Sequence, residues 1–151
     1  MGRLVPAWLG LTAVAAIIAV AACGPVSQPA SIEHKIYASG DWQGIGLQVH
    51  PGDKIAVRAH GAWLYTPGEY HGPEGHARYL APSFYPVPGV PGGVLLARIG
   101  EVGQPLVVGQ AESFVADSFG ELAFRIDDDF LADNDGFVVV QVSIYKGIGP
   151  R

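Results

Sequence analysis

The stretch of this chain with the most chemical potential is DDDFLADNDG, residues 127–136. Within nine positions it holds five carboxylates: Asp127, Asp128, Asp129, Asp133 and Asp135. Like charges this close repel one another, so they must be either well hydrated or neutralised by a cation. One interpretation is a solvated acidic turn, because Asp and Asn favour local backbone hydrogen bonds in turns. The other interpretation is a cation-binding loop.

The spacing within this loop excludes an EF-hand but not calcium. If Gly136 is aligned with the glycine at position six of that motif, Leu131 falls at position one and Val142 at position twelve, where oxygen ligands are required. The loop still offers side-chain oxygens and free backbone carbonyls, the hard ligands that Ca²⁺ prefers. Transition metals are less favoured in the loop, because it contains no histidine or cysteine.

A second group of reactive side chains lies upstream, but it gives weak support for catalysis. His60, His71 and His76 lie near Glu69 and Glu74, so an acid–base pair is conceivable, and HGPEGH resembles a metal-ligand spacing. Glycine and proline between these residues leave no helix to present two ligands on one face. The sequence also contains no GxSxG, HExxH or phosphate-binding loop. We therefore predict that the protein is not an enzyme.

Composition limits the class of protein and of partner. The 151 residues carry a net charge of -5, with 21 glycines and 12 prolines, which predicts one compact domain with many turns. No cluster of Lys and Arg is present, so the chain lacks the charge pattern that nucleic-acid binding needs. Nucleic acid is therefore excluded as a predicted partner.

The N-terminus has the features of a secretory signal. Arg3 precedes an apolar run at residues 4–20, and small residues lead to Cys23, the single cysteine. We predict a signal peptide at residues 1–22. The ending Val20-Ala21-Ala22-Cys23 resembles the bacterial lipobox, which implies lipidation of the Cys23 sulfur and an extracytoplasmic protein anchored to a bacterial membrane.

An ordinary signal, or an uncleaved membrane helix with an incidental cysteine, is the alternative to a lipoprotein. Residues 23–31 are small, polar and proline-bearing, as expected of a lipidated tether. The folded domain is then predicted to occupy residues 32–151.

Within that domain, period-two alternation recurs between Gly, Pro and Asp turns, which predicts an all-β chain. Two adjacent strands flank the turn Pro51-Gly52-Asp53, and the last strand turns Val138, Val140, Val142 and Ile144 inward. Further strands are expected at residues 92–100, 105–109, 112–116 and 121–127, the last of these with Leu122, Phe124 and Ile126 on one face. Together they predict a two-sheet β-sandwich of about seven to nine strands, jelly-roll-like or similar to galactose-binding domains.

One segment, residues 66–92, does not alternate. It is rich in proline and carries three tyrosines and two histidines. Long loops inside a compact domain are usually functional or disordered, and the aromatic content argues against disorder. A mobile surface excursion is the alternative to a binding loop.

Six motifs taken in order resemble the galactophilic lectins of the PA-IL type, which bind galactose through calcium. These motifs are GAWLYTP (61–67), HGPEGH (71–76), GGVLLARIG (92–100), LVVG (106–109), GELAFRIDD (120–128) and DNDGFVVVQV (133–142). The resemblance covers nearly the whole predicted domain. It implies one Ca²⁺ that takes two sugar hydroxyls directly.

Carried over by position, the resemblance implies calcium ligands at the Tyr65 backbone carbonyl, Asp128, the carbonyl of Phe130 or Leu131, Asp133 and Asn134. The sugar-binding candidates that accompany it are His71, Glu74, His76, Tyr79, Asp128 and Asp133. This chain has Tyr79, and then Ser83 or its neighbours, where the family has the histidine and glutamine that hold galactose. Galactose is therefore implied less directly than calcium.

The sequence thus predicts a membrane-anchored, calcium-dependent carbohydrate-binding lipoprotein, with galactosides as the implied ligands. Shallow sugar sites gain affinity from repetition, so we expect a homo-oligomer or a high density on the membrane. The alternative is a non-catalytic envelope lipoprotein that presents residues 66–92 to a protein partner.

Overall fold

The computed structural model describes Gly2 and residues 29–147. The rest of the predicted signal peptide, the lipidation residue Cys23 and the tether up to residue 28 lie outside the described residues. Within the described part, no helix is long and apolar enough to span a membrane. The folded chain begins with strand β1 at Ala30, two residues before the predicted start at Ile32.

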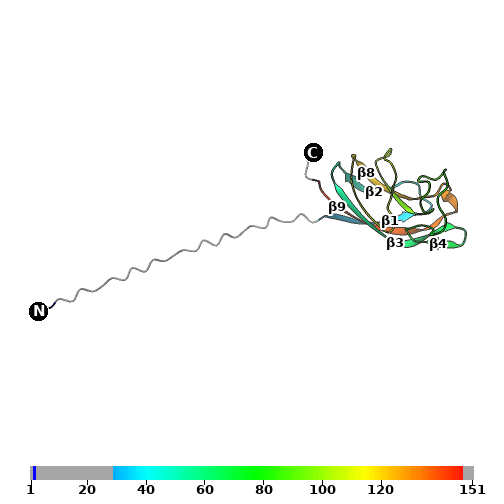
Figure 1. Cartoon of the computed structure of the whole chain (residues 1–151), viewed down its shortest axis with the longest axis horizontal. Helices are drawn as coiled ribbons and strands as arrows, with labels where there is room; N and C mark the ends of the chain where they lie inside the picture. The colour runs from blue at the N-terminus through cyan, green and yellow to red at the C-terminus, as the bar shows by residue number, and fades with distance from the viewer. Residues whose placement is uncertain (1, 3–28, 148–151) are drawn as a thin grey trace.

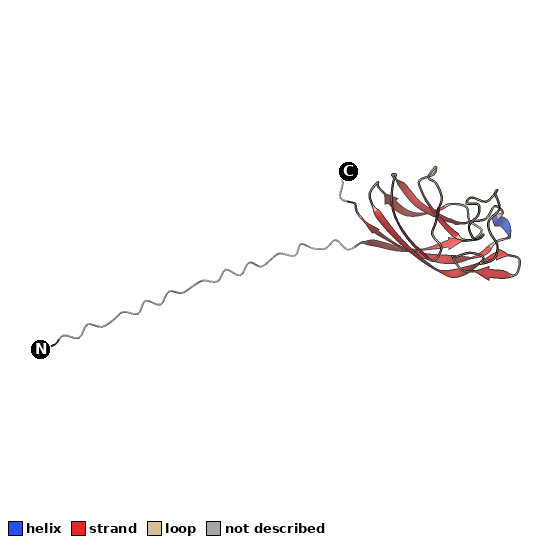
Figure 2. Cartoon of the chain, viewed as in Figure 1, coloured by secondary structure: helices blue, strands red, loops and turns tan. Residues whose placement is uncertain are grey.

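Nine strands form two antiparallel sheets, which confirms the predicted all-β sandwich (Figures 1 and 2). The first sheet has the order β1-β9-β3-β4, and β7 also pairs with β3. Its strands are β1 (Ala30–Tyr37), β9 (Asp135–Tyr145), β3 (Lys54–Thr66), β4 (Glu69–His71) and β7 (Ala111–Val115). The second sheet has the order β2-β8-β5-β6 and comprises β2 (Gln43–Val49), β8 (Gly120–Ile126), β5 (Leu95–Ile99) and β6 (Leu106–Val107).

The long strand β3 organises the first sheet. On one edge it pairs with β9 along almost its full length, from Lys54 opposite Tyr145 to Leu64 opposite Asp135. On the other edge it pairs first with β7 and then, near its end, with the short β4. β3 therefore links the two ends of the sandwich, and its last residues lie beside the start of β9.

The inward faces of the two sheets form a single core. In β9 the predicted residues Val138, Val140, Val142 and Ile144 are buried, and in β8 so are Leu122, Phe124 and Ile126. Alternation places one side of each strand against the opposite sheet, as in other sandwiches. Trp63 is fully buried and donates its indole N–H to the carbonyl of Gly93 at 3.0 Å.

Three features differ from the sequence-based expectation. The strands on either side of residues 51–53 are adjacent along the chain but lie in opposite sheets, because β2 pairs with β8 while β3 pairs with β9. Alternation gives the buried face of a strand but not the sheet that it joins. The structure also adds β1 and β4, which alternation did not single out, and β4 lies within the segment 66–92.

Asp53 stabilises the turn between β2 and β3. Its buried carboxylate accepts hydrogen bonds from the backbone N–H of Gly147 at 3.0 Å, the backbone N–H of His50 at 3.0 Å and the Lys146 ammonium at 2.9 Å. Burial alone would raise the pKa of this carboxyl, but the three donors favour its charged form and lower the pKa to about 2. The turn is thereby tied to the residues that follow β9.

We predict that Asp53→Asn destabilises the domain by about 1–3 kcal/mol at neutral pH, because two backbone donors and an ammonium lose their charged acceptor. The folded-state pKa lies below the unfolded value, so this stabilisation is present above about pH 4 and is lost as the pH falls toward 2. Urea unfolding at pH 7 and at pH 2.5 measures both effects. The difference between wild type and Asp53→Asn should be large at pH 7 and clearly smaller at pH 2.5, and an equal difference at both pH values would contradict the assignment.

Candidate functional site

The acidic loop joins the two sheets at one end of the sandwich. It leaves β8 after Ile126, forms the short 3-10 helix η1 (Leu131–Asp133) and enters β9 at Asp135 in the other sheet (Figure 2). Because Leu64 pairs with Asp135, the end of β3 lies against the end of the loop. This register places Tyr65 close to the carboxylates of the acidic loop.

Asp128 and Asn134 form a buried pair inside the loop. They are only 4% and 6% exposed, and the Asn134 amide donates to Asp128 Oδ2 at 2.8 Å. The Arg125 guanidinium donates to the backbone carbonyl of Asp128 at 2.6 Å and not to its carboxylate. Among the described residues, Asn134 Oδ1 is buried without a hydrogen-bond partner. A buried, unsatisfied acceptor beside a buried carboxylate is an arrangement that a cation would complete.

A shallow cleft of about 230 Å³ opens over this pair. Its walls combine aromatic rings with acidic side chains, and it is lined by Tyr65, Thr66, Pro67, Tyr79, Tyr85, Asp128, Asp129, Phe130 and Asp133. The structure therefore gathers Tyr65, Asp128, Phe130, Asp133 and Tyr79, all named from the sequence, around one cleft. Asn134 joins them through its bond to Asp128.

Tyr65 forms the base of one wall. Its ring lies against the backbone of Gly92 and Gly93, and its hydroxyl is 3.1 Å from that of Tyr85. Burial raises the pKa of Tyr65 to about 12, with the nearby Asp128 charge acting in the same direction. Burial also raises the pKa of Tyr85, and so do its bond to Tyr65 and the Asp128 charge. Both hydroxyls therefore stay protonated and can donate hydrogen bonds.

The backbone of Tyr65 is suited to binding a ligand. Residue 65 falls at a register irregularity between Leu64 and Thr66 in the pairing of β3 with β4, and the pairing with β9 ends at Leu64. In the described structure, residue 65 is thus outside both sets of paired residues. A carbonyl that is not part of a regular ladder is available to a cation or to water.

Asp127 has a different role from its neighbour. It is fully buried, its backbone bonds to Gly93 and Val94, and its Oδ1 accepts the N–H of Val87 at 3.0 Å. Burial raises the pKa of Asp127 to about 6. It is not among the residues that line the cleft, and it anchors the segment 66–92 to the end of β8.

Backbone hydrogen bonds also hold the segment 66–92 in place. His76 N donates to Gly92 O at 2.9 Å, Gly92 N to Tyr79 O at 2.9 Å, and Ala81 N to Val90 O at 2.7 Å. These bonds fold the segment back on itself and set Tyr79 at the edge of the cleft.

Besides Asn134, four sequence-derived candidates do not line the cleft. Glu74 accepts a hydrogen bond from the Gln110 amide at 2.9 Å, and the Leu131 carbonyl accepts the N–H of Asn134 at 3.3 Å. The His71 ring lies 6.0 Å from the Tyr65 ring, and the His76 ring lies 6.2 Å from the Tyr79 ring, between centroids. Of the two carbonyl alternatives, Phe130 is therefore the better placed.

Sequence reasoning did not single out Tyr85, Thr66 or Pro67 as site residues. Tyr85 lies among prolines, and its position in a long aromatic segment was the only sequence signal for a role in binding. Asp129 had been counted among the crowded carboxylates but given no role.

A larger hollow of about 540 Å³ lies at the opposite ends of β5 and β8. Its lining is mainly apolar and includes Ile99, Phe114 and Phe119. None of the binding-site residues predicted from the sequence lines this hollow.

Comparison with solved structures shows a likeness in fold. No protein-family model matches this chain, and no curated protein sequence matches it. Among solved structures, the N-terminal domain of EclA, described as a PllA-like lectin, matches with a TM-score of 0.61. The match covers 75% of this chain and 95% of that domain at 19% sequence identity. The fold is that of a lectin-like β-sandwich.

We predict that Gly93→Ala destabilises the domain and displaces Tyr65. Gly93 has φ +74°, and an added Cβ would lie 2.6 Å from the Tyr65 ring. Gly46→Ala is a matched control, because Gly46 has φ +75° but its added Cβ would meet no atom within 4 Å. Both variants carry the backbone cost of about 1 kcal/mol. Chemical denaturation should show a larger loss for Gly93→Ala, and equal losses would show that the ring is not held against this glycine.

Proposed function

We propose that this protein is a calcium-dependent carbohydrate-binding lipoprotein that binds sugar without turning it over. The observation that carries the proposal is the buried Asp128–Asn134 pair at the base of an open, tyrosine-walled cleft. The lectin-like fold supports carbohydrate binding as the general class.

The donor set fits calcium. Asp128, Asp133 and Asn134 offer side-chain oxygens, and Tyr65 and Phe130 offer backbone carbonyls, all hard ligands. Among the described residues, no Lys, Arg or His forms an ion pair with Asp128, Asp129 or Asp133. Three neighbouring carboxylates without a cationic partner favour a divalent cation. Calcium bound there would supply positions for two sugar hydroxyls.

The cleft also has the chemistry to orient a sugar. Asp133 and Asp129 can accept hydroxyl hydrogen bonds, and the protonated Tyr85 hydroxyl can donate one. The Tyr79 ring offers an apolar face to a pyranose. A cleft this shallow binds a single sugar weakly, so we propose multivalent display as an oligomer or at high membrane density. Galactosides are the first ligands to test.

The calcium site is tested by thermal unfolding of the wild type and of Asp128→Ala combined with Asn134→Ala. A ligand that binds only the folded state stabilises it by about 2.7 kcal/mol at a hundred times its Kd, so calcium should raise the midpoint of the wild type and leave the double variant unchanged. Magnesium should have a smaller effect on the wild type, because it dehydrates reluctantly and demands octahedral geometry.

Asp135→Ala is the matched control for this experiment. Asp135 belongs to the same acidic run but is exposed and does not line the cleft. It should keep the calcium response and also the calcium-dependent binding of galactosides on a glycan array. A double variant that retained both calcium and sugar binding would refute the proposed site.

We propose that the domain is displayed outside the cytoplasm through a lipid on Cys23. Replacing this single cysteine, Cys23→Ser, removes the sulfur that would carry the lipid, so the protein should move from the membrane fraction to the soluble or secreted fraction. Cell fractionation measures the location of the protein, and incorporation of a labelled fatty acid measures its lipidation. Persistence of Cys23→Ser in the membrane would instead indicate an uncleaved membrane segment.

A protein-interaction role is the second candidate, and one observation favours it. Within the segment 66–92, the apolar side chains of Tyr70, Leu80 and Phe84 are 60%, 63% and 66% exposed. Glycans that remain unbound in saturating calcium would favour this role over sugar binding.

A further inference from the structure

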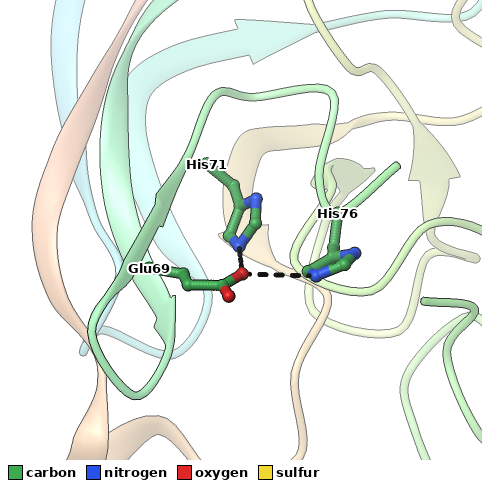
Figure 3. Close-up of side chains that lie close together, drawn as sticks. All are labelled: Glu69, His71 and His76. Carbon is green, nitrogen blue, oxygen red and sulfur yellow. Dashed lines mark ion pairs between the residues drawn. The ribbon is translucent and has the colours of Figure 1, made fainter. Parts of the chain in front are cut away.

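Glu69, His71 and His76 form a compact cluster of potential metal ligands (Figure 3). Nε2 of His71 and Nε2 of His76 each lie 3.5 Å from the same oxygen, Glu69 Oε2. The two imidazole rings are 4.5 Å apart between centroids. The histidine side chains are 15% and 17% exposed, whereas that of Glu69 is 61% exposed, so the cluster opens to solvent on the carboxylate side.

Local backbone geometry explains how the cluster forms without a helix. Glu69 and His71 are two residues apart in β4, so their side chains share one face of the strand. Beyond the Gly72–Gly75 turn, the N–H of His76 donates to the carbonyl of Gly92, which returns the second histidine toward β4. An added Cβ on Gly75 would lie 2.7 Å from Val94 N, so glycine is needed for this close approach.

The arrangement is close to that of a bound transition metal. Tetrahedral zinc with bonds of about 2.0–2.1 Å holds neighbouring ligand atoms roughly 3.3 Å apart. Two of the three separations are already 3.5 Å, and all three ligand atoms lie within 4.8 Å of one another. A modest inward movement of the histidines completes the set.

We propose that Glu69, His71 and His76 bind a divalent transition metal ion of the zinc class. Two imidazoles and one carboxylate favour such an ion over calcium, which prefers oxygen ligands only. None of the three belongs to the proposed calcium ligand set, so this site is independent of the proposed function. The three protein ligands leave a further coordination position for water or for a donor atom of a bound molecule.

Binding has a defined consequence for His76. In the absence of metal, the N–H of Arg78 donates to His76 Nδ1 at 3.1 Å, which places the single ring proton of a neutral imidazole on Nε2. A metal on Nε2 needs the lone pair of that nitrogen, so the ring proton moves to Nδ1 and the Arg78 N–H loses its acceptor. The Arg78 amide therefore reports occupancy of the site.

The site also borders the carbohydrate cleft. His71 lies against Tyr65, and His76 lies against Tyr79, through the ring contacts described above. A metal that links β4 to the turn at His76 would fix the positions of the histidine rings that contact Tyr65 and Tyr79.

The test is isothermal titration of zinc chloride into the untagged full chain in mild detergent, in a Cys23→Ser background that removes the only thiol. We expect about one ion per chain, and a cobalt(II) substitute should give the visible spectrum of a low-coordinate site. Glu69→Gln, His71→Gln and His76→Gln should each weaken zinc affinity by at least about tenfold, because loss of even an outer partner costs that much. Zinc should also shift the Arg78 amide resonance, and excess calcium should not displace the zinc.

The controls are His60→Gln, an exposed histidine on β3, and Glu74→Gln, a carboxylate of the same turn that bonds to Gln110. Both should bind zinc within about twofold of the parent. Glu69 is exposed, so its substitution tests the site without threatening the fold. Absence of stoichiometric zinc binding, or binding that survives all three ligand substitutions, would overturn the proposal.

Discussion

The pairing of β3 with β9 is the constraint on which the rest of the molecule depends. Eleven residue pairs, from Lys54 opposite Tyr145 to Leu64 opposite Asp135, join the longest strand of the first sheet to the strand that follows the acidic loop. A shift of one residue would turn the buried valines of β9 outward, so the hydrophobic core specifies this register strongly. The same register places Tyr65 beside Asp128 and Asn134. Core packing and site geometry are therefore set together.

The acidic run is divided between two environments. Asp127 lies under the segment 66–92 and bonds to the backbone of Val87, whereas Asp128 faces the cleft and bonds to Asn134. Adjacent residues at a strand end point to opposite sides, which explains how neighbouring carboxylates acquire separate roles. One buried charge thus holds the loop that carries Tyr79, and the next contributes to the proposed cation site.

The two proposed metal sites share a wall but differ in chemistry. Oxygen donors line the cleft, and the imidazoles of His71 and His76 lie near the rings of Tyr65 and Tyr79. The ligand type would direct calcium to the cleft and zinc to the histidine cluster, because calcium avoids nitrogen ligands and zinc favours them.

The sequence by itself determined the class of fold and the location of the acidic loop. Alternation in β8 and β9 identified their buried faces, because a half-buried strand shows its environment in every second residue. It also marked the carboxylates and Asn134, since their density is a local property of the chain. Tertiary structure alone decided that β2 and β3 enter different sheets, that Asp127 is buried away from the cleft, and that Glu69 joins His71 and His76. Each of these three features depends on contacts between segments distant in the chain or on the path of a glycine-rich turn. The alternation of residues within a single strand carries no information on such contacts or on such a path.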